Sequence, residues 1–125
     1  MIAVMIEVVP RPGRKGEYFE AAARLRPLIE EAVGFVSSER FESLSEQGKF
    51  LSLSVFRDEA TARRCLERME QRVAEQVDGE EMFSLYRVRL APIVSDGGLK
   101  AASPATQSKP RGLFSRFSFS RFLPA

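Results

Sequence analysis

The apolar positions of the chain begin with residues 2–9, where nearly every side chain is hydrophobic. Alternate positions form two sets, and both are mostly apolar: Ile2, Val4, Ile6 and Val8 in one, and Ala3, Met5, Glu7 and Val9 in the other. Because successive side chains of a strand point to opposite faces, this pattern predicts a β-strand buried on both faces. The Pro-Arg-Pro-Gly segment at 10–13 ends it.

From Lys15 the apolar period lengthens to three or four residues, which is typical of one face of an amphipathic helix. Gly34 is placed as the C-terminal cap of this helix. Pro27 falls inside it, and we expect a kink or a break near Arg26, because proline cannot donate a helical hydrogen bond. The apolar positions are Tyr18, Ala22, Leu25, Ile29 and Ala32.

Two β-like runs follow, Phe35–Leu44 and Phe50–Phe56, joined by a polar loop at 45–48. Gly48 supplies the positive φ that such a hairpin loop needs, so the two runs are predicted to pair as antiparallel neighbours.

Asp58 can cap a second helix, which Asp78 and Gly79 end, and Met82–Val94 is predicted as the last strand. The apolar face of this helix is Ala62, Cys65, Leu66, Met69, Val73 and Val77.

The order β-α-β-β-α-β predicts an α+β domain over residues 1–94 with a ferredoxin-like fold, an antiparallel sheet that carries two helices on one face. Two helices cover only one face of such a sheet, yet the predicted strands are apolar on both. We therefore expect a homodimer in which the second faces meet and the two sheets close into a dimeric α/β barrel.

Residues 95–125 form a separate C-terminal extension with its own charge. The first 94 residues hold 14 of the 19 Lys and Arg and 16 of the 17 Asp and Glu, so the basic charge belongs to the extension. Because residues 1–94 have nearly equal numbers of acidic and basic side chains, we expect no strongly basic surface that would bind nucleic acid.

Within the extension, residues 95–110 resemble a disorder-prone linker, and FSRFS at 114–118 is nearly repeated by FSRFL at 119–123. Two interpretations of the 113–123 tail stay open. It contacts an anionic membrane surface or a partner groove, or else it folds back on its own dimer or is a dispensable extension.

The chain contains no histidine and one cysteine, Cys65. Neither a metal, a haem nor a flavin site is expected, because histidine is the most frequent metal ligand and no cysteine cluster or Gly-rich phosphate loop replaces it. The lone thiol cannot form an internal disulfide, and the N-terminus lacks the features of a signal peptide, so we expect a cytoplasmic protein without cofactors.

Three segments carry a resemblance to a known family: GFVSSERFESL from Gly34, KFLSLSVFRDEATA from Lys49, and FSLYRVRLAPIV from Phe83. Together with the element order, they resemble the antibiotic biosynthesis monooxygenase (ABM) family of dimeric α/β barrels over roughly residues 1–97. The resemblance implies a pocket between sheet and helices for a flat aromatic substrate, which enzymes of the superfamily often oxygenate with O₂ and no metal or flavin.

The chain departs from the family pattern at three positions. Phe56 stands where many relatives have Trp, and Gln71 stands where many have His. The haem-degrading branch also needs Asn where this chain has Ile6, so haem degradation is disfavoured.

The candidate site combines an aromatic slot, cations at its edge and hydroxyl donors, which together could stabilise a substrate oxyanion. Phe56, Arg87 and Tyr86 are assigned catalytic roles, and the predicted substrate-binding residues are Arg40, Phe41, Phe50, Ser52, Ser54, Phe83, Gln71 and Tyr18.

Each of these residue types also has a purely structural interpretation. The phenylalanines could be core residues, the serines could allow close helix packing, and Arg40, Arg87 and Arg89 could pair with Glu7, Glu39 or Glu42 across the sheet. Tyr86 and Arg87 are adjacent in a predicted strand and so point to opposite faces. Cys65 is expected to be a buried, inert thiol.

Two functions remain open from the sequence. The first is a cofactor-independent monooxygenase acting on a small aromatic or quinone-like compound in a pocket between sheet and helices. The alternative is a non-catalytic ligand-binding or stress-associated module of the same dimeric α/β-barrel type.

Overall fold

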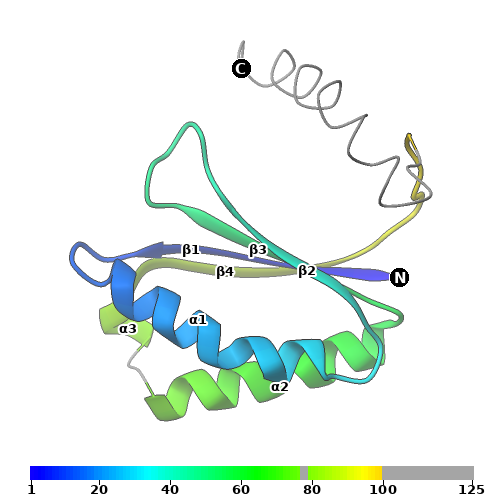
Figure 1. Ribbon diagram of the computed structural model, residues 1–125, viewed down its shortest axis with the longest axis horizontal. Coiled ribbons are helices and arrows are strands. Elements are labelled where there is room, and N and C mark those ends of the chain that lie inside the picture. The colour runs from blue at the N-terminus through cyan, green and yellow to red at the C-terminus, as the bar shows by residue number, and fades with distance from the viewer. Residues whose placement is uncertain (77–78, 100–125) are drawn as a thin grey trace, which may run out of the picture. The chain divides into compact units, whose positions relative to one another are not determined.

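The computed structural model describes residues 1–76 and 79–99 (Figure 1). The chain divides into two units, Met1–Val94 and Ser95–Ala125. Val77 and Asp78 of the predicted second helix, the FSRF repeats and the 113–123 tail lie outside the described residues, whereas Gly79, predicted with Asp78 to end that helix, begins a short further helix.

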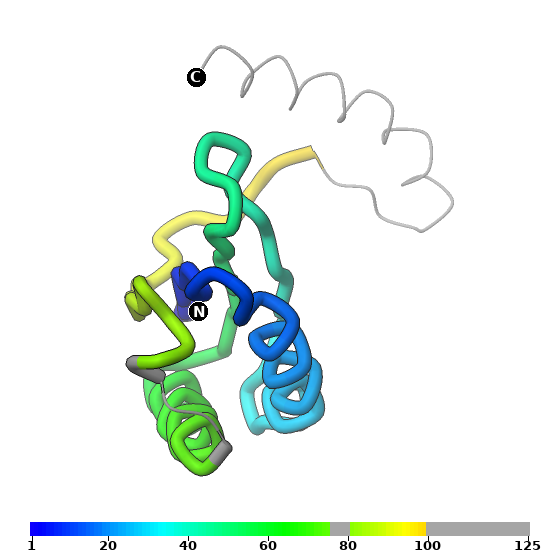
Figure 2. The backbone as a smooth tube through the Cα atoms, turned by 90° about the vertical axis from the view of Figure 1, so that its left-hand side faces the viewer, coloured from blue at the N-terminus to red at the C-terminus, as the bar shows by residue number. Residues whose placement is uncertain are grey.

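The first unit has the predicted order of strands and helices. The elements are β1 (Ile2–Pro10), α1 (Lys15–Glu30), β2 (Phe35–Glu42), β3 (Phe50–Phe56), α2 (Glu59–Gln76), α3 (Gly79–Met82) and β4 (Phe83–Pro92). The strands form one antiparallel sheet in the order β2-β3-β1-β4, and α1 and α2 lie side by side on one face of it (Figure 2). This arrangement confirms the ferredoxin-like α+β fold; the short α3 was not predicted.

The strand register decides which side chains face the helices. Val4 pairs with Ser54, and Ile6 pairs with Ser52 and Val88, so alternate residues of the three strands share the helix-facing side. The core lies between this side and the predicted apolar face of α1, of which Tyr18, Ala22, Leu25 and Ile29 are buried. Its buried residues are Val4, Ile6, Val8, Tyr18, Leu25, Ile29, Phe50, Phe56, Ala62, Cys65 and Met82.

The other side of the sheet, which we call the open face, carries no helix in the described chain (Figure 1). The second set of β1 side chains, Ala3, Met5, Glu7 and Val9, points to this face and is half-buried. In a single copy, β1 is therefore fully buried on its helix-facing side alone.

Two expectations for α1, a break at Pro27 and a cap at Gly34, are wrong. Pro27 does not split the helix, which runs without interruption to Glu30, and the carbonyl of Pro27 accepts a hydrogen bond from the Glu31 amide at 3.0 Å. Gly34 is not the cap, because the capping residue is Glu31 in a right-handed conformation. Instead, Gly34 has a φ of 85° in the turn into β2, and its carbonyl accepts the Arg57 amide at 2.8 Å.

Two local predictions are confirmed. Gly48 has a positive φ of 84° in the hairpin loop. Asp58 caps α2, because its Oδ1 accepts the Thr61 amide at 2.9 Å. The strands are shorter than predicted at their ends: β2 stops at Glu42 and β4 at Pro92.

Candidate functional site

A small cavity of about 70 Å³ lies between the sheet and both long helices. Most of its walls are apolar, and its polar groups are the phenols of Tyr18 and Tyr86, the guanidinium of Arg40 and the hydroxyl of Ser52. The complete lining is Ile6, Val8, Tyr18, Ala21, Ala22, Leu25, Ile29, Arg40, Ser52, Met69, Val73, Met82, Phe83 and Tyr86. We call this space the inner cavity.

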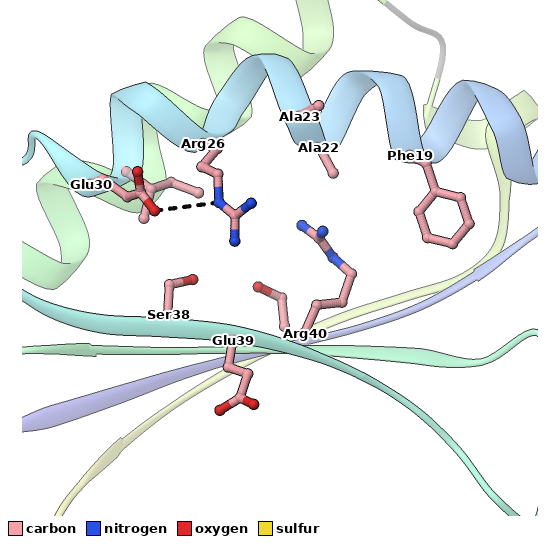
Figure 3. A pocket seen from close by; sticks show the side chains of 10 residues that line it. Phe19, Ala22, Ala23, Arg26, Glu30, Ser38, Glu39 and Arg40 are labelled. Atoms are coloured by element: carbon pink, nitrogen blue, oxygen red, sulfur yellow. Dashed lines mark ion pairs between the residues drawn. The ribbon is translucent and has the colours of Figure 1, made fainter. Parts of the chain in front are cut away.

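A second space of about 240 Å³, the outer cleft, lies between α1 and β2 (Figure 3). It shares four lining residues with the inner cavity: Ala22, Ile29, Arg40 and Ser52. The other residues of the outer cleft are Phe19, Ala23, Arg26, Glu30, Ser38 and Glu39. The two spaces are therefore neighbours, with Arg40 and Ser52 of the sheet and Ala22 and Ile29 of α1 at their common border.

Arg40 and Ser52 lie together because β2 and β3 pair at these residues. From β2, the guanidinium carbon of Arg40 lies 5.6 Å from the centre of the Tyr18 ring on α1, a cation–π distance. Burial raises the pKa of Tyr18, and the nearby charge of Arg40 offsets part of that rise. Tyr18 is therefore a neutral phenol near neutral pH and can donate a hydrogen bond.

Tyr86 comes from β4, where it pairs with Val8 and faces the helices. Its ring centre lies 5.6 Å from that of Phe83, and 45% of the residue is exposed. Burial, with a smaller effect from the charge of Glu70, raises the pKa of Tyr86. Both phenols of the inner cavity are therefore suited to donating a hydrogen bond and are poor general bases at neutral pH.

Aromatic rings join the two spaces. The ring of Tyr18 lies 5.5 Å from Phe50 and 5.8 Å from Phe83, and Phe50 lies 5.1 Å from Phe19. Phe83 lines the inner cavity, whereas Phe50 is buried in the core beside it. The aromatic walls of the inner cavity are therefore Tyr18, Phe83 and Tyr86, and Phe83 is the one predicted slot phenylalanine among them.

Arg26, Glu30, Phe19 and Ser38 were not predicted as site residues. Figure 3 shows the guanidinium groups of Arg26 and Arg40 pointing into the space between α1 and β2, and Nε of Arg26 lies 3.3 Å from Oε2 of Glu30. The spacing of Phe19, Arg26 and Glu30 along α1 could have indicated a polar-edged face beside the apolar one.

Six predicted site residues line neither space: Phe50, which is buried beside the inner cavity, Arg87, and four others. Phe56 is 2% exposed and packs against Phe35 in the core, with ring centres 6.1 Å apart. Ser54 is buried, and its hydroxyl shares a hydrogen bond of 3.0 Å with that of Ser38. Phe41 lies on the open face, and Gln71 is exposed on α2.

Arg87 also lies outside the cavity, on the open face. Its Nε donates to Oε1 of Glu7 at 2.9 Å, and Arg89 and Lys49 lie 3.6 and 3.3 Å from the same carboxylate. Lys49, and then Arg87, hold the pKa of Glu7 below its ordinary value. The alternative that Arg87 and Arg89 pair with Glu7 across the sheet is confirmed.

Metal ligands do not gather among the described residues, which hold no group of three His, Cys, Asp or Glu side chains. Burial raises the pKa of the Cys65 thiol, in agreement with an inert cysteine. None of the described helices is long and apolar enough to cross a membrane.

A curated fungal protein is similar to this chain. The jasmonate monooxygenase ABM of Pyricularia oryzae is 30% identical over 95 residues, which cover 76% of this chain and 44% of that protein. The chain thus spans less than half the length of this relative.

Solved structures share the fold. A Deinococcus radiodurans protein provisionally described as an antibiotic biosynthesis monooxygenase superposes with a TM-score of 0.67 at 10% identity, covering 81% of this chain and 100% of that one. SnoaB, a cofactor-independent oxygenase from Streptomyces nogalater, superposes with a TM-score of 0.62 at 12% identity, covering 76% of this chain and 94% of that one.

The family itself is identified by its model. The model described as antibiotic biosynthesis monooxygenase matches residues 1–77, more than half of the chain. Together with the fungal relative, this match confirms the resemblance in sequence, and the chain belongs to the antibiotic biosynthesis monooxygenase family.

Proposed function

We propose that the protein is a cofactor-independent monooxygenase that oxidises a small aromatic or quinone-like compound, with the reacting ring in the inner cavity. The family supports monooxygenation, and one similar structure is described as a cofactor-independent oxygenase. The observation that carries the proposal is the position of Arg40. It lies at the edge of an apolar cavity with its charge over the Tyr18 ring, and none of the described carboxylates lies within ion-pair distance of it.

This arrangement suits the chemistry of an ionised substrate. A phenol or enol that loses its proton to solvent becomes an anion, which the charge of Arg40 and a hydrogen bond from Tyr18 would stabilise. The apolar walls exclude water, so these two interactions are stronger than they would be in bulk solvent.

The ionised substrate then supplies the electrons that O₂ needs. Transfer of one electron to O₂ and recombination of the two radicals form a carbon–oxygen bond, giving a peroxide at a ring CH₂ carbon. Cleavage of the O–O bond leaves one oxygen as a carbonyl and releases the other as water with the two hydrogens of that carbon. The substrate loses four electrons and O₂ gains four, so the reaction needs no further reductant.

Two of the residues predicted to be catalytic, Phe56 and Arg87, act indirectly in this proposal. Phe56 supports the core beneath the site, and Arg87 belongs to the open face of the sheet. We propose that this face meets the same face of a second copy, because half-buried apolar side chains lie there and members of the family are typically dimers.

An oxygen electrode tests the proposal. Purified protein should accelerate O₂ uptake by anthrone with a chelator present and no added cofactor. Arg40→Met keeps an unbranched, flexible side chain, although a shorter one, and removes its charge, and we expect it to lower kcat/KM by roughly a hundredfold. Tyr18→Phe removes one hydrogen bond and should have a smaller effect.

Arg63→Met is the matched control, because Arg63 is an exposed arginine on α2 that pairs with Glu59 at 2.7 Å. It should leave the rate unchanged. Absence of turnover across a panel of anthrones and hydroquinones would favour the non-catalytic ligand-binding module. Equal rates for Arg40→Met and wild type would remove Arg40 from the mechanism.

A further inference from the structure

We infer that the outer cleft binds a carboxylate of the substrate, so that the natural substrate is a small ring compound carrying one acidic arm. The inference rests on the proposed function in taking the ligand to be the compound that is oxidised. Its evidence comes from the outer cleft, which shares Arg40 with the inner cavity and adds Arg26 and Glu30, two residues that the proposed oxidation does not require.

Two cations face each other in this cleft. Arg26 comes from α1 and Arg40 from β2, and Figure 3 shows both guanidinium groups in the space between these walls. A planar guanidinium donates two parallel hydrogen bonds to a carboxylate, which is why arginine is favoured where carboxylates are recognised. Ser38 and Ser52 line the same space; the Ser52 hydroxyl is an additional donor, whereas the Ser38 hydroxyl shares its hydrogen bond with Ser54.

The charge in the cleft fits a single negative group. Arg26 and Arg40 contribute two positive charges, and Glu30 contributes one negative charge. Glu39 also borders the cleft, but its side chain points away from α1, toward the open face (Figure 3). The net charge of the facing groups is therefore +1, which one carboxylate neutralises; once that carboxylate has displaced Glu30, the two guanidinium groups carry +2, which matches the carboxylate and the ring oxyanion together.

The two spaces together fit a ligand with one apolar and one charged end. The inner cavity of about 70 Å³ is too small alone for a typical ligand, but it borders the outer cleft of about 240 Å³ along Arg40 and Ser52. Together they reach the lower end of the range of roughly 300–1,000 Å³ for ligand pockets. A ring held among Phe83, Tyr86 and Tyr18 would direct a short arm toward Arg26.

Glu30 occupies part of this site as an internal stand-in for the ligand. Its Oε2 lies 3.3 Å from Nε of Arg26, and the two side chains are 50% and 71% exposed. An ion pair this exposed contributes little to stability, so an incoming carboxylate can replace Glu30 at low cost. The two carboxylates then compete for Arg26.

Calorimetry with a matched pair of ligands tests the inference. Phenylacetate and phenylacetamide have the same ring and nearly the same shape, and they differ in charge. Wild-type protein should prefer the acid, and Arg26→Ala should lose about tenfold of that preference. Glu30→Gln should tighten acid binding by roughly two- to fivefold, because it removes the competing carboxylate.

The helix α2 supplies matched controls. Arg63 and Glu59 form an exposed ion pair with the same spacing of four residues, and neither lines the cleft. Arg63→Ala and Glu59→Gln should leave binding of both ligands unchanged. The inference is overturned if wild-type protein binds acid and amide equally, binds neither at millimolar concentration, or keeps its preference in Arg26→Ala.

Turnover separates this inference from the proposed function. If the protein binds the acid selectively but consumes no O₂ with any ring compound, the carboxylate site is supported and the monooxygenase proposal is wrong. A hydroquinone that bears an acetate arm can be supplied as the acid or as the amide. If both forms give equal rates of O₂ uptake, the monooxygenase proposal is supported and the carboxylate site is wrong.

Discussion

At Gly34, the turn between α1 and β2 packs closely against the start of α2. Its φ is 85°, and a Cβ atom built there would lie 2.5 Å from Oγ1 of Thr61. Such a distance is shorter than any normal contact, so a side chain at this position would force α2 or the turn to move. The turn also begins β2, which carries Arg40, so the position of this cation depends on a residue without a side chain.

We expect Gly34→Ala to lower the free energy of unfolding by at least roughly 2 kcal/mol, because the left-handed backbone and the steric contact both disfavour alanine. Gly48→Ala is the matched control, with a φ of 84° and nothing within 4 Å of the added Cβ. It should cost about 1 kcal/mol from the backbone alone. Equal losses in urea unfolding would show that the contact with Thr61 relaxes freely.

Side-chain direction decided which site residues could be predicted. Ser52 and Phe83 were assigned to the pocket from the sequence, and both line the inner cavity. Phe41 and Arg87 were assigned to the same pocket and lie on the open face. One step along a strand reverses the direction of a side chain, so a correct strand assignment still leaves the face undetermined.

The bulge in β2 is one reason why the face of this strand could not be predicted. The register between β2 and β3 shifts between Phe35 and Ser37, so simple alternation from Phe35 does not give the direction of Arg40. The outer cleft had a different obstacle. In the sequence, Arg26 and Glu30 have the pattern of solvent-exposed helix residues. They line the outer cleft because α1 lies beside β2 in the folded chain, which the sequence does not indicate.

At the level of whole elements, hydrophobic periods of two and of three to four identified both long helices and all four strands. The failure at Pro27 has a local reason. Pro27 is the fourth residue from the end of α1, and its missing N–H removes only the one helical hydrogen bond to the carbonyl of Ala23, so the helix continues for its last turn.

The start of α2 supplies a test at this scale. The Asp58 carboxylate accepts the Thr61 amide at 2.9 Å, and this bond is the main reason why its pKa is lowered. We expect Asp58→Ala to cost about 1 kcal/mol of folding free energy and to reduce the helix signal in circular dichroism near its melting temperature.

Asp58→Asn is the control, because an amide oxygen accepts the same hydrogen bond without a negative charge. It should retain most of the stability. If Asp58→Asn is as unstable as Asp58→Ala, the charge rather than the cap stabilises this end of α2.

At the scale of the whole molecule, the open face of the sheet carries apolar side chains that no described helix covers. Met5 and Leu53 pair at its centre and are half-buried in a single copy, and Phe41 is 42% exposed at one edge. An apolar face of this kind is typical of an interface between subunits. Charges of both signs are also present, because Glu39 lies on β2 while Arg89 lies on β4 at the opposite edge. Two-fold symmetry would allow such edges to complement each other.

We therefore expect light scattering to report twice 14.0 kDa at micromolar concentration. Leu53→Asp should yield a monomer of 14.0 kDa, because a carboxylate at the centre of a closed interface would be buried without a partner. Val33→Asp is the control, since Val33 is 71% exposed beyond the end of α1 and away from the open face; it should leave the mass of the dimer unchanged. A folded wild-type monomer would contradict the barrel, and a Leu53→Asp dimer would mean that another surface joins the two copies.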